Sequence, residues 1–171
     1  LPVEVEITLD PDAPLHAIAY DNDADEVLLL AGDQGELHVM PADLSGTPVV
    51  HDIGVDLPGT PQMALDPRTG IVWFTSSGSE QIVGYDRGDQ SLQWVEHPSI
   101  ENVTSLSVTP EGNLLLGDGS VSTCLTAASV EVPDCPWAEQ SNGGHVYFPR
   151  SVTNHTSAME GPEWNNDLPD T

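Results

Sequence analysis

The segment PQMALDPRTGIVWFT, residues 61–75, contains the pattern that decides the fold. An apolar stretch ends at Asp66, a short turn with Pro and Gly follows, and a stretch rich in β-branched and aromatic residues comes next. This arrangement predicts two antiparallel strands joined by a hairpin turn. The pattern recurs around Asp21 and around Thr109. Asp21 and Asp66 are 45 positions apart and Asp66 and Thr109 are 43 apart, a period typical of four-stranded propeller blades.

Each repeat continues with further short strand signals. They cover residues 81–85 and 92–96 in the second repeat, and residues 36–40 and 48–51 in the first. No segment shows a sustained helical period. We therefore predict an all-β protein, a β-propeller of four-stranded antiparallel blades, of which this chain holds about three.

The third repeat is less regular than the other two. Residues 121–125 are expected as its third strand and residues 144–148 as its fourth, with the loop between the two cysteines as an insertion. Within residues 1–10 we expect a strand. The predicted divisions are, in chain order, a strand that completes a neighbouring blade (1–10), three propeller blades within 11–156 (11–56, 57–100 and 101–156) and an acidic tail (157–171).

The second repeat also carries a family pattern, in residues 65–66, 70–75, 82, 85–87 and 96–98. These residues resemble a blade of the streptogramin lyase (virginiamycin B lyase) group, and more broadly of the NHL, SMP-30-like and YVTN propellers. The resemblance implies a propeller fold. Because blade packing sets the repeat pattern, it says little about activity.

For the lyase group, the resemblance implies an active site of His and Glu side chains with Mg²⁺ at the mouth of the central channel. In that family a Glu-x-His pair follows the strand that corresponds to residues 71–75, where this sequence has Ser76, Ser77 and Gly78. Glu36 and His38 form a Glu-x-His pair here, but on a third strand. The resemblance therefore transfers no catalytic residue, and an exposed strand pair is the simpler interpretation of these two.

Three blades do not close a ring, because propellers typically have four to eight. An open array leaves strand edges and one inter-blade face uncovered. We therefore expect further blades from a partner chain, from a second copy, or from the rest of a longer parent polypeptide.

The charge excludes two classes of partner. The chain has 28 Asp and Glu residues, three basic residues and a formal net charge of −25. Three cations cannot neutralise a run of phosphates, so we expect neither nucleic-acid binding nor docking to an anionic membrane. The longest apolar stretch, residues 27–31, is much shorter than the roughly twenty residues that span a bilayer, so no membrane insertion is expected.

Several features favour an exported protein, in an extracellular, periplasmic or cell-surface location. Cys124 and Cys135 have a spacing that a surface loop can close into a disulfide, which favours an oxidising compartment. The chain begins Leu1-Pro2, which suits a mature form after signal removal or a piece of a longer protein. The many carboxylates suit either a salt-rich habitat or loading with extracellular calcium.

Two groups of residues are candidates for specific roles. Asp21, Asp23, Asp25 and Glu26 lie in one turn and could converge on Ca²⁺ as the single cofactor. The turn lacks the glycine and the distal glutamate of an EF-hand loop, and a solvated turn is the alternative. The tryptophans of the repeats, Trp73 and Trp94, are expected in the blade core, with ligand stacking as the alternative.

These observations predict an exported, acidic propeller module that acts as a binding or scaffold domain, and not an enzyme. The alternatives are a metal-dependent enzyme of the lyase or lactonase type, a propeller subunit of a redox assembly, or a calcium-stabilised component of a surface structure. His, Glu and Asp side chains that converge at the channel loops would favour an enzyme, whereas loops of Ser, Thr and Gly would favour a binding module.

Overall fold

The computed structural model describes residues 14–32, 35–76, 78–101, 103–118 and 122–135. Its regular structure consists of three antiparallel sheets and one short 3₁₀ turn, η1 (Pro98–Ile100). The expected strands at residues 3–9 and 144–148 and the expected tail lie outside the described residues. The first residues of the predicted first blade (11–13) and the last residues of the predicted third blade (136–156) also lie outside them.

The sheets follow one another along the chain, and we call them blades 1, 2 and 3. Within each blade, every strand pairs with the next strand in the sequence. Blade 1 consists of β1 (Leu15–Asp21), β2 (Glu26–Ala31), β3 (Glu36–Pro41) and β4 (Val49–Asp52). Blade 2 consists of β5 (Pro61–Leu65), β6 (Ile71–Ser76), β7 (Gln81–Asp86) and β8 (Leu92–Glu96). Blade 3 consists of β9 (Ser105–Val108), β10 (Leu114–Gly117) and β11 (Ser122–Leu125).

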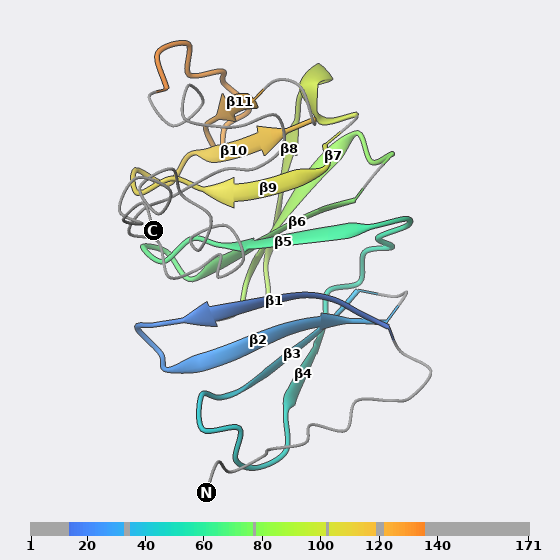
Figure 1. The fold of residues 1–171 in the computed structure, drawn as a ribbon, viewed down its shortest axis with the longest axis vertical. Coiled ribbons are helices and arrows are strands. Elements are labelled where there is room, and N and C mark those ends of the chain that lie inside the picture. Colours follow the sequence, from blue (N-terminus) through green and yellow to red (C-terminus); the bar gives the residue numbers. More distant parts are fainter. Residues whose placement is uncertain (1–13, 33–34, 77, 102, 119–121, 136–171) are drawn as a thin grey trace, which may run out of the picture.

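The three blades lie side by side, with the first strand of each next to the first strand of its neighbour (Figure 1). Strand β1 contacts β5, and β5 contacts β9. This arrangement of consecutive meandering sheets is that of a partial propeller, so the predicted fold class is confirmed.

Alternation along the strands places apolar side chains on both faces of each blade. Between blades 1 and 2 lies one apolar cluster, composed of Ala19, Leu28, Leu30, Leu37, Val39, Ile53, Leu57, Met63, Leu65, Val72, Phe74 and Tyr85. Between blades 2 and 3 lies a second, composed of Ala64, Trp73, Ile82, Val95, Ile100, Val103, Leu106, Val108, Leu114, Leu116 and Leu125. Packing in the second is tight, because a Cβ added at Gly84 would lie 2.7 Å from the Trp73 ring.

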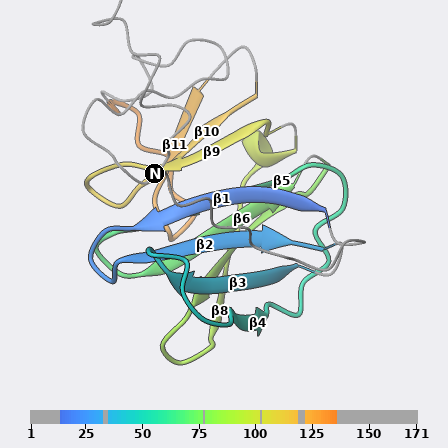
Figure 2. The same ribbon diagram turned by 60° about the horizontal axis from the view of Figure 1, so that its bottom comes forward.

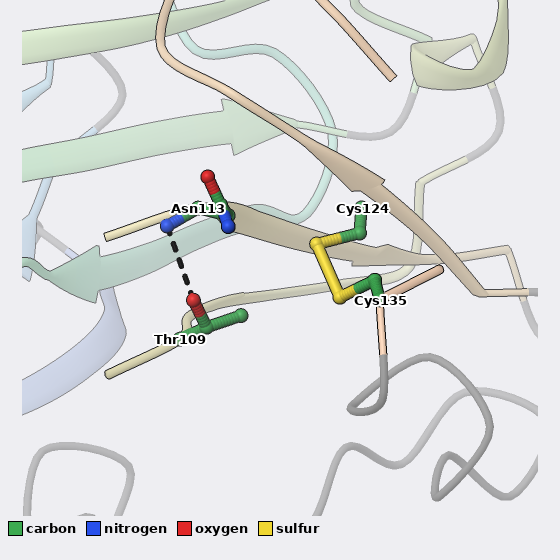
Figure 3. Close-up of a disulfide and its surroundings, with 4 residues drawn as sticks. All are labelled: Thr109, Asn113, Cys124 and Cys135. Carbon is green, nitrogen blue, oxygen red and sulfur yellow. Dashed lines mark hydrogen bonds between the residues drawn. A yellow bond between two sulfur atoms is a disulfide. The ribbon is translucent and has the colours of Figure 1, made fainter. Parts of the chain in front are cut away.

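The repeated residue at the end of each first strand is buried and closes the turn that follows. Asp21, Asp66 and Thr109 are all at most 5% exposed. Asp66 Oδ1 accepts a hydrogen bond from the Arg68 N–H at 2.9 Å, and Thr109 Oγ1 accepts one from the Asn113 N–H at 3.1 Å (Figure 3). The residue that recurs with this period therefore has the same role in each blade. Its short polar side chain accepts hydrogen bonds from backbone N–H groups in the turn, which have no backbone carbonyl partner there.

Arginine side chains join the turns of neighbouring blades. Arg87, in the β7–β8 turn of blade 2, donates to Asp21 Oδ2 and, at 2.8 Å, to Glu26 Oε2 of blade 1. Arg68, in the β5–β6 turn, donates to the Glu111 carbonyl oxygen of blade 3. One arginine side chain therefore bridges each of the two junctions between blades.

One expectation about packing is wrong. Trp73 is buried as predicted, but Trp94 on the outer strand β8 is 48% exposed, because the outer strands extend beyond the inter-blade contact. The segment after Cys124, expected from the sequence as an insertion, stays next to β11. It turns at residues 126–130 and comes back along β11, where Glu131 forms a bridge with Leu125.

We predict that Arg87→Gln destabilises the fold by about 2–3 kcal/mol. The Arg87 side chain is only 16% exposed and the Asp21 side chain 7%, so the substitution leaves a buried carboxylate without its cation. Chemical denaturation followed by circular dichroism measures the change. Arg68→Gln is the matched control, with an expected cost of at most about 1 kcal/mol, because the Arg68 side chain is 52% exposed. Equal effects of the two substitutions would contradict the prediction.

Candidate functional site

A cavity of about 430 Å³ lies at the end of the blades where β7 begins and β8 ends. Its lining residues are Glu80, Gln81, Glu96, His97, Pro98 and Glu101. Gln81 Nε2 donates to Glu96 Oε1 at 2.6 Å and so orients that carboxylate. With three carboxylates and one imidazole, the cavity suits a cationic or hydrogen-bonding ligand better than an apolar one. The sequence alone does not predict this cavity, because its lining residues come from two loops and from the ends of two strands.

The predicted Glu-x-His pair lies elsewhere, on β3 of blade 1. His38 Nε2 and Glu36 Oε2 are 3.4 Å apart, and the His38 side chain is 13% exposed and that of Glu36 44%. Ser76, which stands where the lyase family has catalytic residues, is fully buried at the end of β6. The structure therefore joins Glu36 to His38, and among the described residues the pair belongs to no group of three His, Cys, Asp or Glu side chains that could hold a metal ion.

Most carboxylates of the predicted calcium turn have partners within the protein. Asp21 Oδ1 accepts the N–H groups of Asp23 and Ala24, each at 3.1 Å, and Arg87 binds Asp21 Oδ2 together with Glu26. Asp25 accepts a hydrogen bond from the Tyr20 hydroxyl. This hydrogen bond raises the pKa of Tyr20 above its usual value. Across the described part of the chain, no three His, Cys, Asp or Glu side chains form a group that could hold a metal ion, and the calcium site stays a prediction.

Other acidic residues stabilise turns at the surface. Asp43 Oδ1 accepts the Ser45 N–H and Asp89 Oδ1 accepts the Ser91 N–H, each at 2.9 Å. The hydrogen bonds from the two serines lower the pKa of both aspartates. Some of the acidic side chains therefore stabilise hairpin turns by accepting hydrogen bonds from backbone N–H groups.

A polar contact also links blades 1 and 2 toward their outer strands. The Tyr85 hydroxyl on β7 is hydrogen-bonded to His51 Nδ1 on β4 at 3.0 Å, and the rings meet edge to face with centroids 5.8 Å apart. Burial raises the pKa of Tyr85, and the nearby carboxylates of Asp52 and Asp86 raise it further.

The predicted disulfide is present between Cys124 and Cys135 (Figure 3). Both residues are buried, and they pack with Leu115 and Val132 in a third, smaller apolar cluster. The disulfide is therefore part of the apolar packing against blade 3.

The outer face of blade 1 is turned away from blade 2 (Figure 2), and its apolar side chains differ in exposure: Leu29 and Met40 are each 3% exposed, whereas Ile18 is not buried. Ile18 on β1 is 56% exposed, whereas Met63, at the same place of the next repeat, is 5% exposed because blade 1 covers it. Ile18 and Met63 each precede the buried Asp of their turn by three positions. Tyr20 is likewise half-buried where its counterpart Leu65 is fully buried. The outer face of blade 1 is therefore the equivalent of a packed inter-blade face.

No family model and no curated protein sequence matches the chain. Several solved structures have a similar fold. Virginiamycin B lyase from Staphylococcus aureus aligns with a TM-score of 0.53 and 15% identity, over 75% of this chain and 44% of that one. Hydrazine synthase from Kuenenia stuttgartiensis aligns with a TM-score of 0.53 and 11% identity, over 77% of this chain and 38% of that one.

A luciferin-regenerating enzyme aligns with a TM-score of 0.50 and 14% identity, over 73% of this chain and 48% of that one. The chain thus spans less than half the length of each of these proteins. The resemblance to virginiamycin B lyase and other propellers is confirmed at the level of the fold, and such low identities show the fold alone. Separately, the described residues include no helix that is long and apolar enough to span a membrane.

The calcium hypothesis predicts that EDTA lowers the melting temperature, because bound Ca²⁺ stabilises the folded state by mass action. The double substitution Asp23→Asn and Asp25→Asn should remove this difference while leaving the Arg87 ion pairs in place. Differential scanning calorimetry at constant ionic strength is the measurement. A melting temperature that EDTA leaves unchanged rejects the site.

The Tyr85 contact predicts a loss of stability in alkaline solution. Because the pKa of Tyr85 is raised in the fold, its stabilising contribution is complete below about pH 10 and is lost as the pH rises through the raised value. Tyr85→Phe should cost about 1 kcal/mol near neutral pH and make stability fall less steeply above pH ~10. Urea denaturation at a series of pH values tests this, and parallel curves for the two proteins would contradict it.

Proposed function

We propose that the chain is an exported, acidic propeller module that acts as a binding or scaffold domain and docks at least one further blade. The single observation that carries this proposal is the exposure of Ile18 on the outer face of blade 1. Ile18 is 56% exposed there, although its counterpart Met63 is 5% exposed under blade 1. A sheet face built for burial favours an interaction with a surface of matching shape.

The occupant that fits this face best is another four-stranded antiparallel blade. Blade 2 presents Ala64, Trp73 and Ile82 to blade 3, and blade 1 presents Ala19, Leu28 and Leu37, from the same repeat positions, to blade 2. A blade with small and large apolar residues at these positions would cover Ile18 in the same way. It can belong to a partner chain, a second copy or a longer parent polypeptide.

Charge and the disulfide support export. A net charge of −25 keeps a protein soluble in a salt-rich medium, where self-repulsion is screened, and a buried disulfide on blade 3 suits an oxidising compartment. For a small ligand, the cavity at the loops of blade 2 favours a cation or a polar molecule, since Glu80, Glu96 and Glu101 line it.

An extended chain tests the proposal directly. A second copy of residues 57–100 placed ahead of residue 11 presents blade 1 with the surface that blade 2 presents to blade 3. We expect the extended chain to melt about 5 °C higher than the original, which corresponds to about 2 kcal/mol at this size. Ile18→Asp should remove this gain, because it places a charge in the new interface.

The same substitution in the original chain is the control for unrelated damage. Since Ile18 is exposed there, Ile18→Asp should change the melting temperature little. Val130→Asp, at another exposed apolar residue (59% exposed), should leave the gain of the extended chain intact. If the extended chain melts like the original and its added segment is digested as fast as an unfolded peptide, blade 1 does not dock a blade.

A further inference from the structure

Blade 3 also has an outer face, the one turned away from blade 2. Its strands send Leu106, Leu114 and Leu116 toward blade 2. Alternation therefore places Ser107 and Leu115 on the opposite face, together with Cys124, which pairs with Leu115 across the β10–β11 ladder.

This face corresponds to a packed face of blade 2. Counting from the buried turn residues Asp66 and Thr109, Ser107 occupies the place of Ala64, which contacts blade 3. In the ladders, Leu115 occupies the place of Trp73 and Cys124 that of Gly84. In a continuing array, a following blade would pack on these side chains.

This face is covered by the chain itself. Leu115 is fully buried and packs with Cys124, Cys135 and Val132. Cys124 is 2% and Cys135 4% exposed. At the other end of the array the central Leu29 is also buried, at 3% exposed, but Ile18 beside it is 56% exposed.

The covering segment is held by backbone hydrogen bonds and by the disulfide. The Thr126 N–H donates to the Val130 carbonyl oxygen at 2.8 Å, which closes the turn. The Val132 N–H donates to the Cys124 carbonyl oxygen at 2.8 Å, next to the bridge between Leu125 and Glu131. From there the chain reaches Cys135, whose sulfur is bonded to Cys124 beside β10 (Figure 3).

We propose that residues 126–135, closed by the disulfide, form an end cap that takes the place of a following blade on blade 3. With the cap in position, blade 3 does not accept the face of another blade, and docking of blades takes place at blade 1 only. A symmetric ring of two copies is thereby blocked, because it requires blade 3 of each copy to pack on blade 1 of the other. The cap lies at the opposite end from the proposed docking face; the expected rise in mass rests on the proposed function of blade 1, whereas the expected increase in ANS binding does not.

Opening the cap tests this proposal. In the full chain, Cys124→Ala together with Cys135→Ala removes the covalent closure while keeping small apolar side chains. We expect this variant to bind the dye ANS more strongly than the wild type, because the apolar face is uncovered. Light scattering after size exclusion should show its mass rising with concentration toward twice 18.2 kDa. Both measurements are made in about 1 M KCl, where the Debye length is about 3 Å and the charges are screened.

A third substitution identifies the surfaces involved. Adding Ile18→Asp to the double variant should abolish the rise in mass and leave the increase in ANS binding. Val132→Ser, which keeps the disulfide and weakens the packing on Leu115, should shift both measurements in the same direction by a smaller amount. Val130→Ser, on the same segment but exposed, is the matched control and should leave both at the wild-type level.

Two results would overturn the end cap. One is a double variant that folds, as judged by circular dichroism, and keeps the mass and ANS signal of the wild type. The other is a rise in mass that Ile18→Asp does not prevent. If the double variant does not fold, Val132→Ser decides, and unchanged mass and ANS binding in that variant would count against the proposal.

Discussion

Each blade of this protein has two apolar faces, and both have to be covered. In β6, the neighbouring residues Trp73 and Phe74 point to opposite faces, and both are at most 2% exposed. In β10, Leu114, Leu115 and Leu116 are all buried in the same way. A single sheet of this kind cannot bury its own residues, so each blade depends on a neighbour on either side. The stacking of blades 1 to 3 and the covering of blade 3 by its own loop satisfy this requirement, and the exposed Ile18 on the outer face of blade 1 is where it is not fully met.

Two of the three basic residues of the chain lie where the blades meet. In a chain with 28 carboxylates and three basic residues, Arg87 and Arg68 both bridge the turns of neighbouring blades. The acidic turn at Asp21 therefore resembles a metal site in sequence while two of its carboxylates, those of Asp21 and Glu26, bind Arg87. Other acidic side chains, such as Asp43, hold hairpin turns. The negative charge is thus partly structural and not only a coating of the surface.

Local features of the sequence are sufficient to predict the strands. They do not predict the contacts between blades. The pattern at residues 71–75 predicts β6 (Ile71–Ser76) almost to the residue, because hairpin turns and alternation act over a few positions. Arg87 and Asp21, by contrast, are 66 positions apart, and nothing local relates them. The exposure of Trp94 depends on how far the outer strands extend past the neighbouring blade. The cavity at Glu80 and Glu96 needs β7 and β8 to be placed before it can be seen.

The open face of blade 1 differs from the packed face of blade 2 in composition as well as in exposure. In corresponding positions, blade 2 has Leu65 and Val83 and blade 1 has Tyr20 and His38. His38 is paired with Glu36, so this face contains hydrogen-bonding and titratable groups beside Ile18. Interfaces between partners that also exist apart are more polar than permanent ones. The composition of blade 1 therefore favours a partner blade that binds to an already folded module over one that is needed for its folding.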